Sequence, residues 1–512
     1  MRTYDNPVIS GFHPDPSVCR AGEDYYLVCS SFEYFPGVPI FHSRDLVHWR
    51  QIGNVLDRPA QLDLAPDVPA SGGVYAPTIR HHDGLFYVIT TDVSGRGTFL
   101  VTAERPEGPW SDPVRVDVPG IDPDLAWDDN GDCWCATAGN HVTRIDPRSG
   151  KVLEGPIPVW SGTGGKYPEA PHLFHIGDWW YLLTAEGGTE RAHAVSIARA
   201  RSPRGPYEPG PANPVVTHRG TGRPIQSTGH ADLVQAADGS WWMVLLATRP
   251  RGHTPEFHVL GRETFLTPVR WRDGWPVAGP VEESHAAPAA WHPLSPSPSP
   301  SREDFDAPVL APCWISPRSR PDGSWSLTER PGRLTLHATG DTLDRPGHTF
   351  VGRRQQHHDC RVAVRLDPGS GRAGLSVRLD EAHHYDLEVH DGQASVIARI
   401  GPLRQRLTSH RVPAAPLTLV IDIRTAGVLP PTVTRPGQAD DRPPGVGAHG
   451  PDTIAFSVGW DGEHRPLTEL DGRYLSTEVA TGFTGRVIGM YVTEGSAAFD
   501  WFHYEPSPTR RP

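Results

Sequence analysis

Short runs in which apolar and polar residues alternate follow one another along most of the chain. Aromatic-rich runs such as "YYLVCSS" (25–31), "LFYVITT" (85–91) and "WWMVLLA" (241–247) are bounded by glycine, proline, asparagine or aspartate. Alternation of this kind is typical of half-buried β-strands, whereas an amphipathic helix needs apolar residues three and four positions apart. No stretch has a convincing helical period. The sequence therefore predicts an all-β protein.

The first half of the chain repeats one unit five times. In each copy a small, acidic or imidazole side chain is followed by proline or alanine, then a polar residue and an aliphatic one. The copies begin at Asp15, Ala76, Asp122, Ala170 and His230. A turn, an aromatic strand and further short strands follow, so each unit is a meander of about four strands. Five units predict a five-bladed β-propeller over residues 1–285, because radially arranged blades protect their own edges.

The repeat places chemistry in the central channel. The first strand of each blade lines that channel, so Asp15, Asp122 and His230 point into one funnel, together with Glu169 one position before its repeat. Asp-Pro pairs are also ordinary turn formers. Bringing three carboxylates from three blades close together nevertheless costs free energy, so the arrangement favours a functional role for them. The prolines on both sides of Asp15 predict an extended, rigid backbone there.

The second half has a different organisation. Residues 286–303 are rich in proline and serine and predict an extended linker. Residues 304–512 return to alternating strands without the repeat, which predicts a β-sandwich. A Pro/Gly-rich stretch at 425–450 interrupts these strands and is typical of a surface loop.

The composition of the chain argues against several classes of partner. The net charge of −12 and the pI near 6.1 argue against a nucleic-acid partner. The six cysteines lack zinc-site spacing and are expected to be free, mostly buried thiols. No basic region followed by an apolar stretch opens the chain, and the longest apolar run is far too short for a membrane span. We therefore expect a cytoplasmic protein without a membrane partner.

Six motifs in order resemble those of glycoside hydrolase family 43, in particular its two-domain β-xylosidases and α-L-arabinofuranosidases. They are "NPVISGFHPDPSV" (6–18), "SSFEYFPGVPIFHSRDLVHW" (30–49), "GGVYAPTIR" (72–80), "YPEAPHLF" (167–174), "WYLLTAEGGT" (180–189) and "LGRETFLTPVRW" (260–271). The resemblance covers nearly the whole chain. It implies that the sandwich is a concanavalin-like accessory domain.

The resemblance implies roles for the funnel residues. Asp15 matches the general base, Glu169 the general acid, and Asp122 the carboxylate that orients the acid and tunes its pKa. The substrate-binding set that it implies is Phe32, Tyr75, His230, Arg262 and Phe483. Many xylosidases of this group have tryptophan at the place of Tyr75. No cofactor is required, although some relatives hold a calcium ion near the residue that matches His230.

Glycoside hydrolysis needs these residue types. One protonated carboxyl donates to the leaving oxygen and one carboxylate activates water, and the two lie roughly 6.5–9.5 Å apart in inverting enzymes. Burial and the negative charge of Asp122 are expected to raise the pKa of Glu169. Hydrogen bonds and the cation of Arg262 are expected to keep Asp15 ionised.

The leading hypothesis is an exo-acting, inverting enzyme that removes terminal β-D-xylose from xylo-oligosaccharides. An α-L-arabinofuranosidase, or an enzyme that accepts both sugars, is the alternative within the same chemistry. A non-catalytic carbohydrate-binding propeller is the alternative of another class, and a protein-interaction propeller finds no support. Relatives of this type often assemble, so a homo-oligomer is also expected.

Overall fold

The computed structural model describes residues 2–289, 291–294, 301–318, 323–426 and 450–507. The parts of the expected linker and surface loop that fall at 290, 295–300 and 427–449 lie outside the described residues. Within the described part, the helical elements are a 3₁₀ turn, η1 (Gly472–Leu475), and a short helix, α1 (Thr477–Ala480). No helix there is both long and apolar enough to cross a membrane.

The chain divides into two compact units. The first comprises residues 1–249 and 262–297, and the second comprises residues 250–261 and 298–512. The short segment 250–261, which lies between two strands of the first unit in the sequence, therefore belongs to the second unit. The sequence analysis did not predict that this segment belongs to the second unit, because the segment has no pattern of its own.

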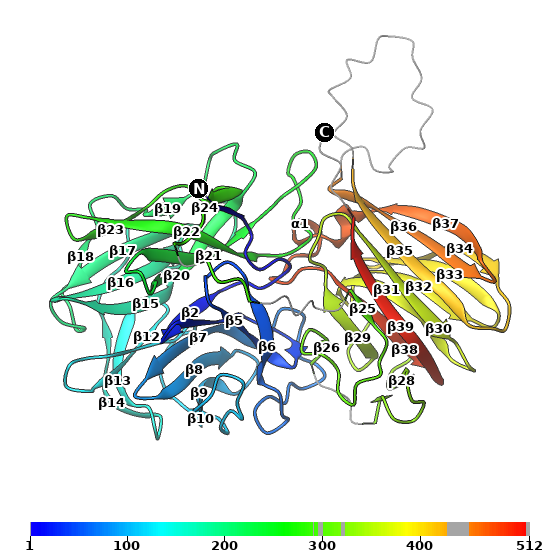
Figure 1. Cartoon of the computed structure of the whole chain (residues 1–512), viewed down its shortest axis with the longest axis horizontal. Helices are drawn as coiled ribbons and strands as arrows, with labels where there is room; N and C mark the ends of the chain where they lie inside the picture. Colours follow the sequence, from blue (N-terminus) through cyan, green and yellow to red (C-terminus); the bar gives the residue numbers. More distant parts are fainter. Residues whose placement is uncertain (1, 290, 295–300, 319–322, 427–449, 508–512) are drawn as a thin grey trace, which may run out of the picture. The chain divides into compact units, whose positions relative to one another are not determined.

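Each of the five predicted repeats forms one antiparallel sheet of the first unit (Figure 1). The sheets are β2 (Ser17–Ala21), β3 (Asp24–Val28), β5 (Gly37–Ser43), β6 (Arg50–Leu56); β7 (Val74–His82), β8 (Leu85–Asp92), β9 (Gly97–Ala103), β10 (Val114–Arg115); β11 (Asp124–Trp127), β12 (Cys133–Thr137), β13 (His141–Asp146), β14 (Lys151–Pro158); β15 (Glu169–Ile176), β16 (Trp179–Glu186), β17 (Ala194–Ala200), β18 (Glu208–Pro209); and β20 (Gln226–Gln235), β21 (Trp241–Thr248), β22 (Glu263–Arg272), β23 (Trp275–Ala278). A short strand, β19 (Val216–Thr217), also pairs with β17. The first strands of neighbouring sheets adjoin in a closed ring, which confirms the five-bladed propeller.

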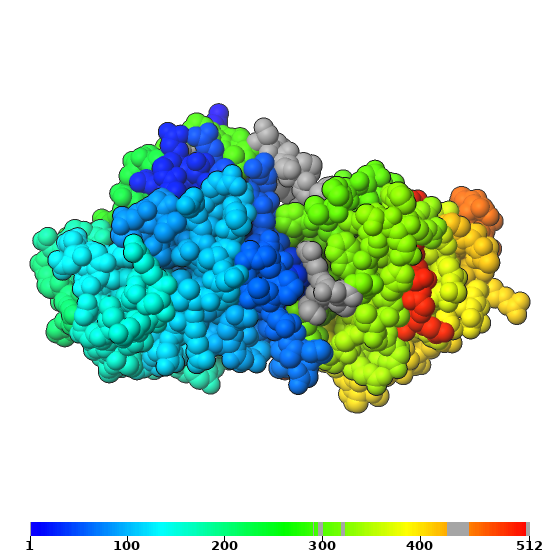
Figure 2. All heavy atoms as spheres, turned by 90° about the horizontal axis from the view of Figure 1, so that it is seen from below, coloured from blue at the N-terminus to red at the C-terminus, as the bar shows by residue number. Residues whose placement is uncertain are grey.

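The core of this unit is divided among the gaps between blades. Neighbouring residues of one strand point to opposite faces, so Cys19 packs toward the second blade and Val18 toward the fifth. Val18 shares its cluster with Val244 and Leu266 of the last blade, which closes the ring. The closure is reinforced by β1 (Thr3–Asp5), which pairs with β24 (Ser284–Ala286). In Figure 2, the blades coloured blue to cyan form much of the visible surface of this unit.

A backbone feature marks the start of every repeat. The five residues that open the repeats all have a positive φ: Asp15 (56°), Ala76 (32°), Asp122 (54°), Ala170 (50°) and His230 (46°). The expectation of extended backbone at Asp15 is therefore wrong. Side chains other than glycine rarely adopt this left-handed conformation, and each instance costs about 1–3 kcal/mol unless the surroundings enforce it. Here it kinks the chain just before β2 and β11 and near the start of β7, β15 and β20, and it directs the first side chain of each repeat.

The second unit is the predicted sandwich. One sheet has the order β27-β28-β39-β30-β35-β36-β37 with β25 beside β39, and the other has the order β29-β38-β31-β32-β33-β34. The strands of the first sheet are β25 (Arg302–Glu303), β27 (Trp325–Ser326), β28 (Leu334–His337), β30 (Cys360–Asp367), β35 (Leu417–Thr425), β36 (Asp452–Trp460), β37 (Glu463–Asp471) and β39 (Ser496–Pro506). Those of the second are β29 (Thr349–Arg354), β31 (Arg372–Asp380), β32 (His383–His390), β33 (Gln393–Ile400), β34 (Leu403–Arg411) and β38 (Val487–Glu494). Both sheets contribute to one apolar core.

The second unit also contains a fully buried ion pair. Arg486 donates to both carboxylate oxygens of Asp452, at 2.5 and 3.0 Å, and to the carbonyl oxygens of Leu475 and Gly472. Removing one partner of a buried pair leaves the other charge without compensation. We expect Arg486→Leu to lower the free energy of unfolding of this unit by about 3–5 kcal/mol. Chemical denaturation of the variant measures this loss, and an unchanged midpoint would contradict it.

Candidate active site

Asp15 lies just before β2, the inner strand of the first blade, and polar groups surround its carboxylate. Its side chain is buried, the Ser30 hydroxyl donates to Oδ2 at 2.5 Å, and Arg262 Nη1 donates to Oδ1 at 3.2 Å. The ring of His230 lies beside the same carboxylate, with Nδ1 3.3 Å from Oδ1. Burial alone would raise the pKa of Asp15, but Arg262, His230 and Ser30 together lower it below the ordinary value. The expected ionised carboxylate is thus present.

Asp122 and Glu169 come from the third and fourth blades. Asp122 is buried, and its Oδ2 accepts a hydrogen bond from the backbone N–H of Ala170 at 3.1 Å, which ties it to the residue after Glu169. Glu169 begins β15 and lies just before a β-bulge, where the pairing with β16 shifts register. Such bulges redirect a side chain at the end of a strand. The same irregularity follows Tyr75 in β7.

Both carboxyls are held toward their protonated forms. Burial raises the pKa of Glu169 to about 7, with a further increase from Asp15 that Arg262 partly opposes. Burial, and then the charges of Glu169 and Asp15, raise the pKa of Asp122 well above its ordinary value. The expectation that the charge of Asp122 raises the pKa of Glu169 is not met, because burial and Asp15 raise it, and Glu169 in turn raises the pKa of Asp122. The site therefore lowers the pKa of Asp15 and raises the pKa values of Glu169 and Asp122.

An aromatic wall lies next to the Arg262 side chain. The rings of Phe32 and Tyr75 meet edge to face with centroids 5.5 Å apart, and the Arg262 guanidinium lies 5.7 Å from the Phe32 ring. The Tyr75 hydroxyl donates to the Ser71 carbonyl oxygen at 2.6 Å. Gly73 permits this packing, since a Cβ there would lie 2.3 Å from the Phe32 carbonyl oxygen.

Two residues that the sequence analysis did not select also belong to this group. Arg262 Nη1 donates to the Thr189 hydroxyl at 3.0 Å. His193 is buried, faces the Ser227 carbonyl oxygen at 3.2 Å, and fills the space beside Gly229. Burial lowers the pKa of His193 to about 4, so the ring is neutral near neutral pH. Thr189 ends the quoted "WYLLTAEGGT" motif, which was the available signal for it.

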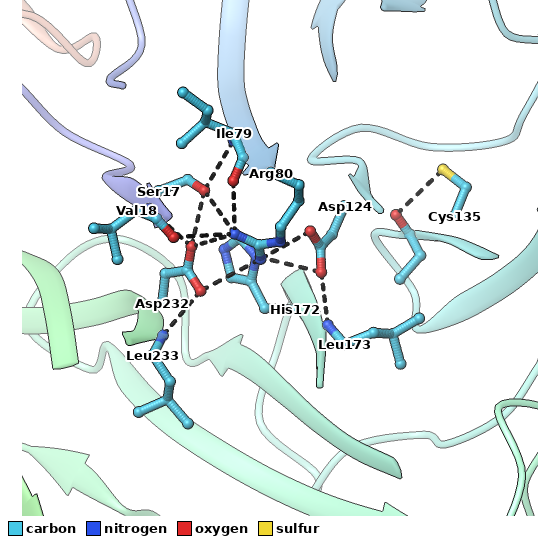
Figure 3. A network of polar contacts seen from close by, with 11 residues as sticks. Ser17, Val18, Ile79, Arg80, Asp124, Cys135, His172, Leu173, Asp232 and Leu233 are labelled. Carbon is cyan, nitrogen blue, oxygen red and sulfur yellow. Dashed lines mark hydrogen bonds and ion pairs between the residues drawn. The ribbon is translucent and has the colours of Figure 1, made fainter. Parts of the chain in front are cut away.

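Beyond this group, the inner strands share a second polar cluster, shown in Figure 3. Its members are Ser17, Arg80, Asp124, His172 and Asp232, one from the first strand of each blade. Four of them occupy the third position of their repeat. We call this cluster the channel hub. The sequence analysis assigned none of them a role at the site, although the repeat register places four of them at the same position.

Phe483 and the six cysteines complete the residues that the sequence analysis considered, and Glu186 lies in the quoted motif "WYLLTAEGGT". Phe483 belongs to the second unit, between α1 and β38, and is partly buried. Glu186 at the end of β16 is buried and accepts hydrogen bonds from the backbone and hydroxyl of Thr163, both at 2.8 Å. The six cysteines are free, as expected, and all but Cys313 are buried.

The families and proteins that this chain resembles are consistent with this arrangement of residues. The model of "Glycosyl hydrolases family 43" matches residues 4–276, and that of "Beta xylosidase C-terminal Concanavalin A-like domain" matches residues 302–428 and 446–505. The chain is 39% identical to a non-reducing end α-L-arabinofuranosidase of Bacteroides ovatus, over 98% of this chain and 95% of the relative. It is 37% identical to a β-xylosidase of Bacillus subtilis, over 71% of this chain and 74% of that protein.

Solved structures agree. A xyloglucan-locus family 43 protein of Bacteroides ovatus superposes with a TM-score of 0.88 at 39% identity, covering 99% of this chain and all of the other. The family 43 protein BlXynB of Bacillus licheniformis gives 0.88 at 32% identity, again over 99% of this chain and all of the other. The chain belongs to glycosyl hydrolase family 43 and is a glycoside hydrolase.

Proposed function

We propose that the protein is an exo-acting β-D-xylosidase that hydrolyses terminal xylosyl residues of xylo-oligosaccharides with inversion of configuration. The observation that carries the proposal is the unequal setting of the funnel carboxyls. Asp15 is held ionised by Arg262 and Ser30, whereas the pKa of Glu169 is raised to about 7. One carboxylate and one carboxylic acid on different blades are what a single displacement requires.

In the proposed reaction Asp15 accepts a proton from a water molecule as that water attacks the anomeric carbon. Glu169 donates its proton to the glycosidic oxygen as the bond to the leaving sugar breaks. Each product leaves neutral, and proton exchange with solvent restores both carboxyls. Asp122, linked to the backbone beside Glu169, orients the acid. Phe32, Tyr75, Arg262 and His230 contact the terminal sugar.

An α-L-arabinofuranosidase is the second candidate. Tyr75 favours it, because many xylosidases of the group that this chain resembles have tryptophan at that position. The Bacteroides ovatus relative named for arabinofuranosidase activity supports the same alternative. Both sugars would use the same acid and base, so the two candidates differ in the fit of the wall formed by Phe32 and Tyr75.

Parallel assays on aryl β-D-xyloside and aryl α-L-arabinofuranoside distinguish the candidates. We expect the larger kcat/KM on the xyloside, and a ratio of about ten or more, equivalent to at least 1.4 kcal/mol, in favour of the arabinofuranoside would reverse the choice. Proton NMR of the first sugar released from xylotriose should show the α-anomer. Binding of xylobiose without turnover between pH 4 and 8 would instead support a binding propeller.

A further inference from the structure

Arg80 is the centre of the channel hub. Its guanidinium lies between two buried carboxylates, with Nη2 2.8 Å from Asp124 Oδ1 and Nη1 2.8 Å from Asp232 Oδ2 (Figure 3). Nη1 also donates to the Ser17 hydroxyl at 3.2 Å and to the Ile79 carbonyl oxygen at 3.0 Å. The Arg80 side chain thus contacts groups of all four other blades, with His172 as its contact in the fourth.

The hub carboxylates in turn hold the starts of the inner strands. Asp232 accepts from the Ser17 hydroxyl at 2.8 Å and from the Val18 N–H at 3.0 Å. Asp124 accepts from the Leu173 N–H at 2.7 Å. Four of the hub residues, all except Arg80, come two positions after the first residue of their repeat, as Ser17 comes after Asp15. The hub therefore fixes the strand ends that carry the catalytic groups.

His172 completes the hub through one ring nitrogen. Arg80 Nη2 lies 3.0 Å from His172 Nδ1, and a guanidinium can only donate, so Nδ1 accepts this hydrogen bond. The neutral ring then carries its proton on Nε2. If Arg80 were removed, two carboxylates and the lone pair of Nδ1 would face the vacated space.

A calcium ion near His230, which the family resemblance raised, does not fit the residues present. Calcium binds six to eight oxygen ligands. The carboxylate next to His230 is Asp15, which already pairs with Arg262 and accepts from Ser30. Among the described residues, no group of three or more His, Cys, Asp or Glu side chains is arranged to hold a metal. The channel carboxylates Asp124 and Asp232 are both bound to Arg80.

We propose that Arg80 is the built-in cation of the central channel. Its delocalised, permanently charged fork binds both Asp124 and Asp232, offsets one of their two negative charges and joins the five inner strands, so it takes the place that a divalent cation would otherwise occupy. It acts as a positioning residue for Asp15, Asp122 and Glu169 and does not touch the sugar. This inference goes beyond the choice of sugar and needs only a substrate that the wild type hydrolyses.

The test is Arg80→Ala in the full-length chain, assayed with and without added cations. We expect kcat/KM to fall on the order of 10- to 100-fold, the range seen when partners behind a functional group are removed. Guanidinium chloride well below its denaturing range, or calcium chloride, should restore part of the lost activity and raise the Tm. Calorimetry should detect calcium binding to Arg80→Ala and not to the wild type, whose activity should be indifferent to chelators.

Arg144→Ala is the matched control. Arg144 also lies between two carboxylates, Asp132 at 3.0 Å and Glu154 at 3.4 Å, but all three belong to the third blade and lie outside the channel. Its loss should leave kcat/KM unchanged and give no response to cations. Full activity in Arg80→Ala, or a loss that neither cation reverses, would overturn the proposal.

A second pair of variants covers the case in which Arg80→Ala does not fold. Arg80→Met leaves two carboxylates without a cation, whereas Arg80→Met combined with Asp232→Asn removes one of those charges. If charge balance governs the hub, the double variant has the higher Tm. A double variant no more stable than Arg80→Met would contradict the built-in cation.

Discussion

Glu169→Ala is expected to slow hydrolysis of xylobiose by about 10²–10⁴-fold, the usual contribution of a general acid. Aryl xylosides with a good leaving group should lose far less, because their leaving oxygen departs without a proton. The comparison of kcat/KM on the two substrates measures the effect. Equal losses on both would contradict the acid role of Glu169. Glu154→Ala, which removes a partly exposed glutamate on the outer strand β14 of the third blade, is the control that should change neither rate.

The pH profile tests the same residue in the wild type. Activity requires Asp15 ionised and Glu169 protonated, so kcat/KM should fall below the lowered pKa of Asp15 and above about pH 7, where Glu169 loses its proton. In Glu169→Ala, assayed on an activated xyloside, the alkaline fall should disappear while the acid one remains. An alkaline fall that persists would place the titrating acid elsewhere.

Asp15→Ala is expected to reduce turnover of every xyloside by a similar factor, again about 10²–10⁴-fold, because attack by water is impaired whatever the leaving group. Azide needs no deprotonation, so it should restore turnover of an activated xyloside and yield the α-xylosyl azide. Formation of the β-azide would contradict inversion, and failure of azide to act would weaken the base role. Asp128→Ala, which removes contacts to the turn between β11 and β12 and to the Trp134 indole, should keep the wild-type rate.

The repeat made both the propeller and the convergence of its carboxyls predictable. Its punctuation at Asp15, Ala76, Asp122, Ala170 and His230 is local, and a period shared by five blades fixes which strand lines the channel. The electrostatics could not be read in the same way. Which of Asp122 and Glu169 perturbs the other depends on burial and on Arg262, which joins the site from far along the sequence.

Some strands of the sandwich were hard to predict from the sequence because their position in the sheets makes them polar. β34 and β37 each lie at the edge of a sheet, and most of their residues are exposed. An edge strand solvated on both faces loses the alternation on which prediction depends, and its charges discourage pairing with another chain. Arg80 escaped notice for the opposite reason, since a single arginine at the end of "GGVYAPTIR" has no pattern of its own.

The shared left-handed backbone at the start of each repeat has a consequence for how this funnel can change. The scaffold imposes that conformation at all five positions, and its cost depends on the side chain that stands there. Aspartate and asparagine tolerate it better than most residues. Ala76 and Ala170 occupy two such positions with the smallest chiral side chain. They are equivalent backbone positions at which evolution or design can introduce a new functional side chain without changing the fold of a blade.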